Sequence, residues 1–187
     1  MADVKKYAKW VLRWEGNYVN DPNDAGGETN KGITLKTWAG CGYDCTEKIP
    51  EVKMMRYGKP VIYKNVTKSL FEMTDEQFTQ ILKSKYWDYW KADTIKSQSV
   101  AEMLVQWMWG SGYTGVKEAQ KVLGVAADGI VGSKTLAAVN SRNPKELWET
   151  LKKAREQFFR NLVTKRPSNE KFLKGWLNRL NDMKFEG

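Results

Sequence analysis

The most informative stretch of the sequence reads Trp14-Glu15-Gly16-Asn17-Tyr18-Val19-Asn20-Asp21-Pro22-Asn23-Asp24-Ala25-Gly26-Gly27-Glu28-Thr29-Asn30-Lys31-Gly32-Ile33-Thr34. Its Asp-Pro, Gly-Gly and Lys-Gly pairs are typical of turns, so it predicts a polar loop with room for a short hairpin. The loop begins with a glutamate that stands beside a tryptophan. This carboxyl group is the first feature that a functional interpretation has to explain.

The segment before the loop, from Asp3 to about Gly16, predicts a helix. Asp3 can cap it, and an apolar stripe follows at helical spacing: Val4, Tyr7, Ala8, Val11 and Leu12. Glu15 continues this stripe next to Trp14, so we expect it to be partly desolvated and to retain a proton near neutral pH. A glutamate at a helix C-terminus is more often a capping or ion-paired residue, so spacing alone leaves both roles open.

The chain of 187 residues contains no histidine. Zinc peptidases and amidases need imidazole ligands, and serine and cysteine hydrolases of the triad kind need an imidazole base. A hydrolase with this composition must therefore rely on carboxylates, or less commonly on lysine or tyrosine. Ala25 and Gly32 also stand where a calcium loop needs other ligands, so we expect no metal and no cofactor. Cys41 and Cys45 are interpreted as loop thiols, free or optionally bridged.

The net charge of +9 predicts attraction to a polyanion, which could be nucleic acid, anionic lipid or an acidic cell wall. No run of like charges resembles a nucleic-acid-binding tail, and no apolar run is long enough for a membrane span. The N-terminus lacks the apolar core of a signal peptide. We therefore expect synthesis in the cytoplasm, delivery by a holin, a secretion system or lysis, and no nucleic-acid partner.

The rest of the chain is predicted to be helical, apart from a turn or weak hairpin between Val52 and Val66. A capping box at Thr74–Gln77 opens one helix, Ser99–Glu102 is expected to open another, and Asn143-Pro144 starts a long one. Residues 172 to 180 predict a last amphipathic helix. No Pro/Gly/Ser-rich linker interrupts these segments.

The loop resembles the signature of glycoside hydrolase family 108, the N-acetylmuramidases of bacteria and phages, some of them labelled secretion activators. The matching string runs from Glu15-Gly16 through Asn20-Asp21-Pro22 to Gly32-Ile33-Thr34. The family is known for a Glu-Gly-Gly motif whose glutamate is the proposed catalytic residue, and Glu15 matches it. Asn17 replaces the second glycine of that motif, which leaves the acid itself unchanged. The resemblance implies a mainly α, lysozyme-like fold with one or two short β-hairpins in a compact body.

The loop is also similar to the wider phage-type lysozyme pattern, which pairs a glutamate with a later acidic residue and a threonine. This resemblance implies that Asp24 is the second catalytic carboxylate. Thr29 or Asn30 would orient water or substrate, and Tyr18 and Asp21 would contact the glycan. Among the aromatic residues, we expect Trp107 and Tyr113 to bind sugar.

The second half resembles the predicted peptidoglycan-binding domain that accompanies this family, through Ala119–Val125, Asp128–Gly132 and Thr135-Leu136. The Asp-Gly-x-x-Gly sequence is a tight turn between helices, and because turn motifs of this length are common we favour a pure packing role over ligand binding for it. Family members carry an aspartate where this chain has Gln106, a difference that favours a role limited to binding.

These observations together predict residues 1–92 as a lysozyme-like catalytic region and residues 93–187 as a peptidoglycan-binding region, packed in the same globule. The leading hypothesis is a monomeric muramidase that acts on peptidoglycan at the cell wall or in the periplasm. The alternative is a non-catalytic peptidoglycan-binding or secretion-accessory protein. A nucleic-acid-binding protein is a third hypothesis that rests on charge alone.

Overall fold

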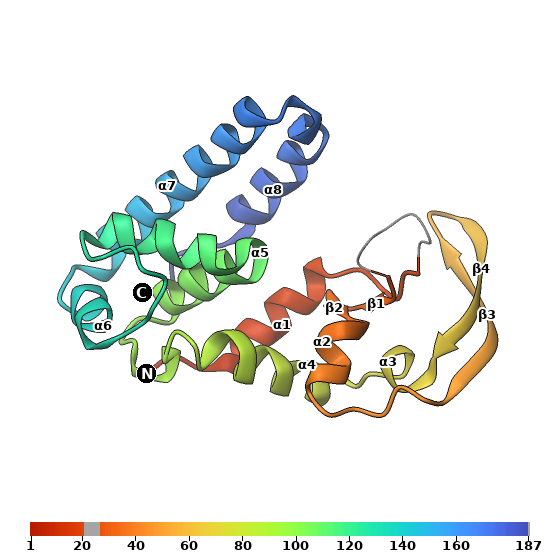
Figure 1. Cartoon of the computed structure of the whole chain (residues 1–187). Coiled ribbons are helices and arrows are strands. Elements are labelled where there is room, and N and C mark those ends of the chain that lie inside the picture. Colours follow the sequence, from red (N-terminus) through yellow and green to blue (C-terminus); the bar gives the residue numbers. More distant parts are fainter. Residues whose placement is uncertain (21–26, 187) are drawn as a thin grey trace. The chain divides into compact units, whose positions relative to one another are not determined.

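The computed structural model describes residues 1–20 and 27–186, and its arrangement is shown in Figure 1. The α-helices of this part of the chain are α1 (Val4–Trp14), α2 (Leu35–Gly40), α3 (Lys68–Phe71), α4 (Asp75–Leu82), α5 (Gln98–Leu123), α6 (Ser133–Asn140), α7 (Pro144–Lys165) and α8 (Glu170–Asp182). Two antiparallel hairpins pair β1 (Thr29–Asn30) with β2 (Ile33–Thr34) and β3 (Lys48–Arg56) with β4 (Lys59–Thr67). The predicted mainly helical fold with short hairpins is confirmed.

The chain divides into two compact units. The hairpin unit comprises Ala8–Ile81, and the helical unit comprises Met1–Tyr7 together with Leu82–Gly187. The division expected from sequence, after residue 92, stays a prediction. Among the described residues, no helix is both long and apolar enough to cross a bilayer.

Helix α1 has the N-terminal cap and the buried apolar stripe that its sequence predicts. The Asp3 carboxylate accepts a hydrogen bond from the Lys5 backbone N–H at 2.8 Å, which caps the first turn. Val4, Tyr7, Ala8 and Val11, four residues of the predicted stripe, are all buried. The helix ends at Trp14, directly before the glutamate that the sequence singled out.

The larger hairpin is longer than its sequence predicts, because each strand has nine residues. Tyr57 and Gly58 make the turn with φ angles of 50° and 75°, the left-handed pair typical of a tight type I′ hairpin. Tyr63, Val66 and Thr67 of β4 are buried, whereas the residues around the turn are exposed. One end of the hairpin is therefore anchored in its unit and the other projects into solvent (Figure 1).

In the helical unit, α7 packs against both α5 and α8. Helix α5 is kinked at Gly112, whose φ of 56° and ψ of −145° are not helical. Past the kink, Gly115 lies so close to the first half of α5 that an added Cβ would be 2.3 Å from the Trp107 carbonyl oxygen. The two halves of α5 can meet at this angle because residue 115 has no side chain.

Two of the helix starts expected from sequence differ in outcome. The capping box is confirmed, because Thr74 and Gln77 exchange reciprocal side-chain to backbone hydrogen bonds. The start of α5 was placed wrongly: its cap is Ser97, whose hydroxyl accepts from the Val100 N–H, and Ser99 is a buried residue inside the helix.

Cys41 and Cys45, which lie beyond α2, are free thiols.

Candidate active site

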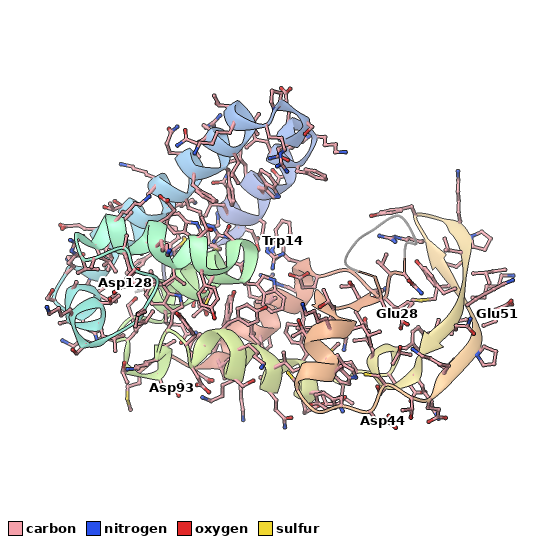
Figure 2. The ribbon with its side chains drawn as sticks, in the orientation of Figure 1. Trp14, Glu28, Asp44, Glu51, Asp93 and Asp128 are labelled. Atoms are coloured by element: carbon pink, nitrogen blue, oxygen red, sulfur yellow. The ribbon has the colours of Figure 1, made fainter. Side chains whose placement is uncertain are left out.

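The end of α1 positions Glu15. Its backbone N–H still donates to the Val11 carbonyl at 3.0 Å, which continues the helical hydrogen bonds for one residue beyond Trp14. The Glu15 side chain is half-buried, as is that of Trp14, whose ring lies 6.3 Å from the ring of Trp10. Figure 2 shows Trp14 at this end of α1. Glu15 thus directly follows the end of α1, whose last turns carry the paired Trp10 and Trp14 rings.

A groove begins with the residues that follow Glu15. This hairpin groove has a volume of about 250 Å³ and is lined by Gly16, Asn17, Tyr18, Met54, Met55, Arg56, Tyr57 and Tyr63. A second hollow of about 450 Å³ is lined by Asn20, Glu51, Ile62, Tyr63 and Lys64. Tyr63 lines both. The residues that follow Glu15 therefore lie beside two hollows, and residues of the β3–β4 hairpin form the other side of each hollow.

The groove and the hairpin beside it carry exposed aromatic and cationic side chains. Tyr57 is 92% exposed, and the Arg56 guanidinium lies 5.5 Å from the centre of its ring. Exposed cations extend along the same hairpin at Lys53, Lys59 and Lys64. Amphipathic aromatic rings stack on sugar faces, and cationic side chains attract anionic wall polymers.

Glu28 connects the loop to the base of the hairpin (Figure 2). Its carboxylate accepts hydrogen bonds from the Thr67 backbone N–H at 2.8 Å, from the Thr67 hydroxyl at 2.9 Å and from the Tyr18 hydroxyl at 3.0 Å. The Lys48 ammonium lies 3.5 Å away and also donates to the Thr67 hydroxyl. Glu28 is only 9% exposed, so this network lies in the interior of the hairpin unit.

The network fixes the protonation state of both acidic members. Burial raises the pKa of Glu28, but the hydrogen bonds from Thr67 and Tyr18 and the charge of Lys48 outweigh burial, and the pKa ends below its ordinary value. Burial also raises the pKa of Tyr18, and the hydrogen bond and charge of Glu28 raise it further. Glu28 is therefore an ionised structural anchor and not a proton donor.

The residues expected from sequence to form the site in this unit are placed as follows. Asp21 and Asp24 lie outside the described residues. Tyr18 and Asn30 are 3% and 5% exposed, and the Asn30 amide donates to the Leu70 and Phe71 carbonyls at 2.8 and 3.0 Å. Thr29 is half-buried in β1. Their roles toward substrate stay predictions, although Tyr18 and Asn30 present almost no surface to a ligand in this conformation.

The family model described as glycosyl hydrolase 108 matches residues 8–112 of the chain. The protein belongs to this family. A second model, described as a predicted peptidoglycan domain, matches residues 114–181 of this glycosyl hydrolase 108 chain. The resemblance stated from sequence is thereby confirmed, and the chain is a glycoside hydrolase with a peptidoglycan-related, lysozyme-like function.

Solved structures support the same assignment. The glycosyl hydrolase 108 chain is similar to the structure of SagA from Brucella abortus, with 31% sequence identity and a TM-score of 0.71. The similarity covers 96% of this chain and 90% of SagA. No curated protein matches the chain.

Within the helical unit of this glycosyl hydrolase 108 protein, the other residues expected at the site have contrasting surroundings. Trp107 is 1% exposed and packs edge-on against Phe158 at 5.9 Å, so its indole does not reach the surface in this conformation. Tyr113 is 61% exposed and lies 5.4 Å from the ring of Tyr89. Gln106 is 2% exposed, and its side-chain oxygen accepts the Tyr7 hydroxyl hydrogen bond. Substrate binding by Trp107 and Tyr113 stays a prediction.

The Asp-Gly turn of the predicted peptidoglycan domain is organised by Gln120, a residue that the sequence did not single out for this role. Gln120 is fully buried, its amide nitrogen donates to Asp128 and Ile130, and its oxygen accepts the Gly129 N–H at 2.7 Å. The Asp128 carboxylate in turn accepts the Ile130 N–H at 2.8 Å. The turn between α5 and α6, where Figure 2 labels Asp128, therefore has a packing role.

Proposed function

We propose that this protein is an N-acetylmuramidase that cleaves the glycan strand of peptidoglycan, with Glu15 as its general acid. The observation that carries the proposal is the position of Glu15: half-buried at the end of α1, with the next residues entering the hairpin groove. Membership of the glycosyl hydrolase family supports it, and a hydrolase without histidine relies on carboxylates of this kind more often than on lysine or tyrosine.

The proposed reaction follows general glycosidase chemistry. Glu15 donates its proton to the oxygen that links N-acetylmuramic acid to the next sugar, and the bond from that oxygen to C1 breaks. Positive charge develops at C1 and the ring oxygen, and water supplies the new hydroxyl group at C1. Asp24 is the proposed second carboxylate, which assists the water or the charged sugar and accepts the proton that water releases.

The hairpin is the proposed support for the glycan. Tyr57 offers an exposed ring for stacking, and Arg56 with the neighbouring lysines attracts an acidic wall. The predicted peptidoglycan domain supports peptidoglycan as the partner, and we propose that the protein acts there as a monomer, at the cell wall or in the periplasm.

The decisive experiment compares the wild-type protein with Glu15→Gln on isolated cell walls. Turbidity and new reducing ends are followed, and the digest is treated with borohydride before mass analysis. A muramidase leaves reduced N-acetylmuramic acid at the new ends, whereas a glucosaminidase leaves reduced N-acetylglucosamine. We expect muramic ends from the wild type and a rate at least about 100-fold lower from Glu15→Gln.

Glu76→Gln is the matched control, because Glu76 is an exposed carboxylate on α4 of the same unit and lines neither hollow. It should retain the wild-type rate. Glucosamine ends would contradict muramidase activity, and an active Glu15→Gln protein would contradict the assignment of the acid.

Gln106, at the position where family members carry an aspartate, favours one alternative: a protein that binds peptidoglycan without cutting it. This alternative predicts that the wild type and Glu15→Gln sediment equally with cell walls and that neither protein releases reducing ends. That result would support the alternative and refute the hydrolase.

A further inference from the structure

The helical unit contains a pocket that the proposed catalytic reaction does not use. It has a volume of about 240 Å³ and is lined by Ile95, Lys96, Ser97, Val100, Val139, Asn140, Arg142 and Pro144. These residues come from the segment before α5 and its first turn, the end of α6, and the connection from α6 into the start of α7. We call it the Lys96–Arg142 pocket.

The pocket combines an apolar floor with cationic residues. Ile95, Val100 and Val139 are 1%, 2% and 4% exposed, so their side chains form a packed lining. Lys96 and Arg142 are exposed residues, and the described residues that line the pocket include no carboxylate. In the described part of the chain, no acidic side chain lies within ion-pair distance of either cation.

Hydrogen bonds hold the lining residues in place. The Asn140 side chain accepts from the Lys96 N–H and donates to the Thr94 carbonyl, both at 3.0 Å, which ties the end of α6 to the segment before α5. The Arg142 guanidinium donates to the Val122 and Leu123 carbonyls at 3.1 and 2.8 Å. These neutral partners fix the guanidinium in place without cancelling its charge. The pocket is thus formed before any ligand arrives.

The size and chemistry of the pocket restrict its ligand. Pockets for drug-sized molecules span roughly 300–1,000 Å³, so this smaller one suits one or two small residues of a ligand. The two cations favour an anionic ligand, and the apolar floor favours an aliphatic group next to the charge over a fully hydrated phosphate. A short aliphatic peptide with a free carboxylate satisfies both requirements.

We propose that the Lys96–Arg142 pocket binds the terminal carboxylate and adjoining methyl groups of a peptidoglycan peptide stem. The identity of this ligand rests on the proposed function, which supplies peptidoglycan as the partner. The pocket would hold the wall by its peptide, independently of the glycan reaction at Glu15.

The test is a titration of the full-length ¹⁵N-labelled protein, followed by amide chemical shifts. The probes are N-acetyl-D-alanyl-D-alanine with a free carboxylate, the same dipeptide as its C-terminal amide, and inorganic phosphate. We expect saturable shifts at residues 95–97 and 139–142 with the free acid and none with the amide. Phosphate that binds as well as the acid would contradict a peptide ligand, and shifts located elsewhere or equal for acid and amide would overturn the proposal.

Matched variants make the test specific. Lys96→Gln should weaken binding of the free acid about threefold or more, because one exposed cation is lost. Lys153→Gln removes an equally exposed charge from α7 outside the pocket and should leave binding unchanged. Equal affinities of wild type and Lys96→Gln would refute the site. Glu15→Gln should bind the peptide as the wild type does, so failure of hydrolysis and failure of this pocket are distinguishable.

Discussion

The Glu28 carboxylate accepts hydrogen bonds from both the backbone N–H and the hydroxyl of Thr67, which lies 39 residues further along the chain. Glu28 directly precedes β1, and Thr67 is the last residue of β4. Tyr18 donates to the same carboxylate, so one side chain holds the loop after Glu15, the small hairpin and the base of the large hairpin together. The walls of the hairpin groove therefore depend on an ionised side chain that takes no part in the proposed proton transfer.

We predict that Glu28→Gln destabilises the protein. Glutamine has nearly the same size, but its amide nitrogen would face hydrogen-bond donors where an acceptor is needed. The expected loss is about 1–3 kcal/mol in the free energy of unfolding, measured by chemical denaturation. Glu51→Gln, an exposed change on β3 of the same unit, should shift the free energy of unfolding by less than about 0.5 kcal/mol. Equal stabilities of the two variants would contradict the anchoring role.

The contribution of Glu28 should also depend on pH. Its folded-state pKa lies below the unfolded value of 4.5, so the stability it adds is complete above that value. As the pH falls below 4.5 and through the folded-state pKa, protonation removes this contribution. The stability difference between the wild type and Glu28→Gln should shrink over the same range. A difference that stays constant from pH 7 to pH 3 would show that the charge is irrelevant.

We predict that Tyr57 contributes to glycan affinity and not to stability. Its ring is 92% exposed at the hairpin turn, so Tyr57→Ser removes little packing. The expected result is an unchanged unfolding midpoint and a KM for cell walls raised about fivefold or more, with a smaller change in kcat. Tyr57→Phe, which keeps the exposed ring at the turn, should leave KM unchanged.

Two glycines in helices should respond to alanine in opposite directions. A Cβ on Gly115 would lie 2.3 Å from the Trp107 carbonyl oxygen, so Gly115→Ala should cost about 2 kcal/mol or more. Gly175 in α8 has open space around it, and Gly175→Ala should add about 0.5–1 kcal/mol through helix propensity. Thermal unfolding of both variants checks the pair, and two changes of the same sign would contradict this account of the α5 kink.

Local signals in the sequence were sufficient for much of the fold. The Asp3 cap, the Thr74 capping box and the Asn143-Pro144 start of α7 each involve residues only a few positions apart, and the structure contains all three. The start of α5 was misplaced because Ser97 and Ser99 are equally plausible caps in a sequence. Only tertiary contacts decide between them, because Ser99 is buried and its hydroxyl donates a hydrogen bond to the Glu186 carbonyl.

The candidate site was less accessible to sequence reasoning. Glu15 could be found because it follows an apolar stripe and matches a family motif. In the sequence, Glu28 cannot be told apart from the other polar residues of the loop. Its partners Lys48 and Thr67 lie on distant strands, and no local sequence pattern predicts that these strands contact the loop. The sequence does not predict the burial of Trp107 either, because an indole on an amphipathic helix has the same spacing whether it faces the core or a ligand.

The kink at Gly112 falls where one family match ends, at residue 112, and just before the other begins, at residue 114. The junction between the two sequence modules is therefore not a tether but a kink between two helical segments of α5 that lie in close contact, since residue 115 has no side chain. A chimaera that exchanged one module at this point would split α5 at its kink and separate two segments whose backbones are in close contact. Engineers who wish to retarget the protein to another wall should graft new loops onto it and leave this helix intact.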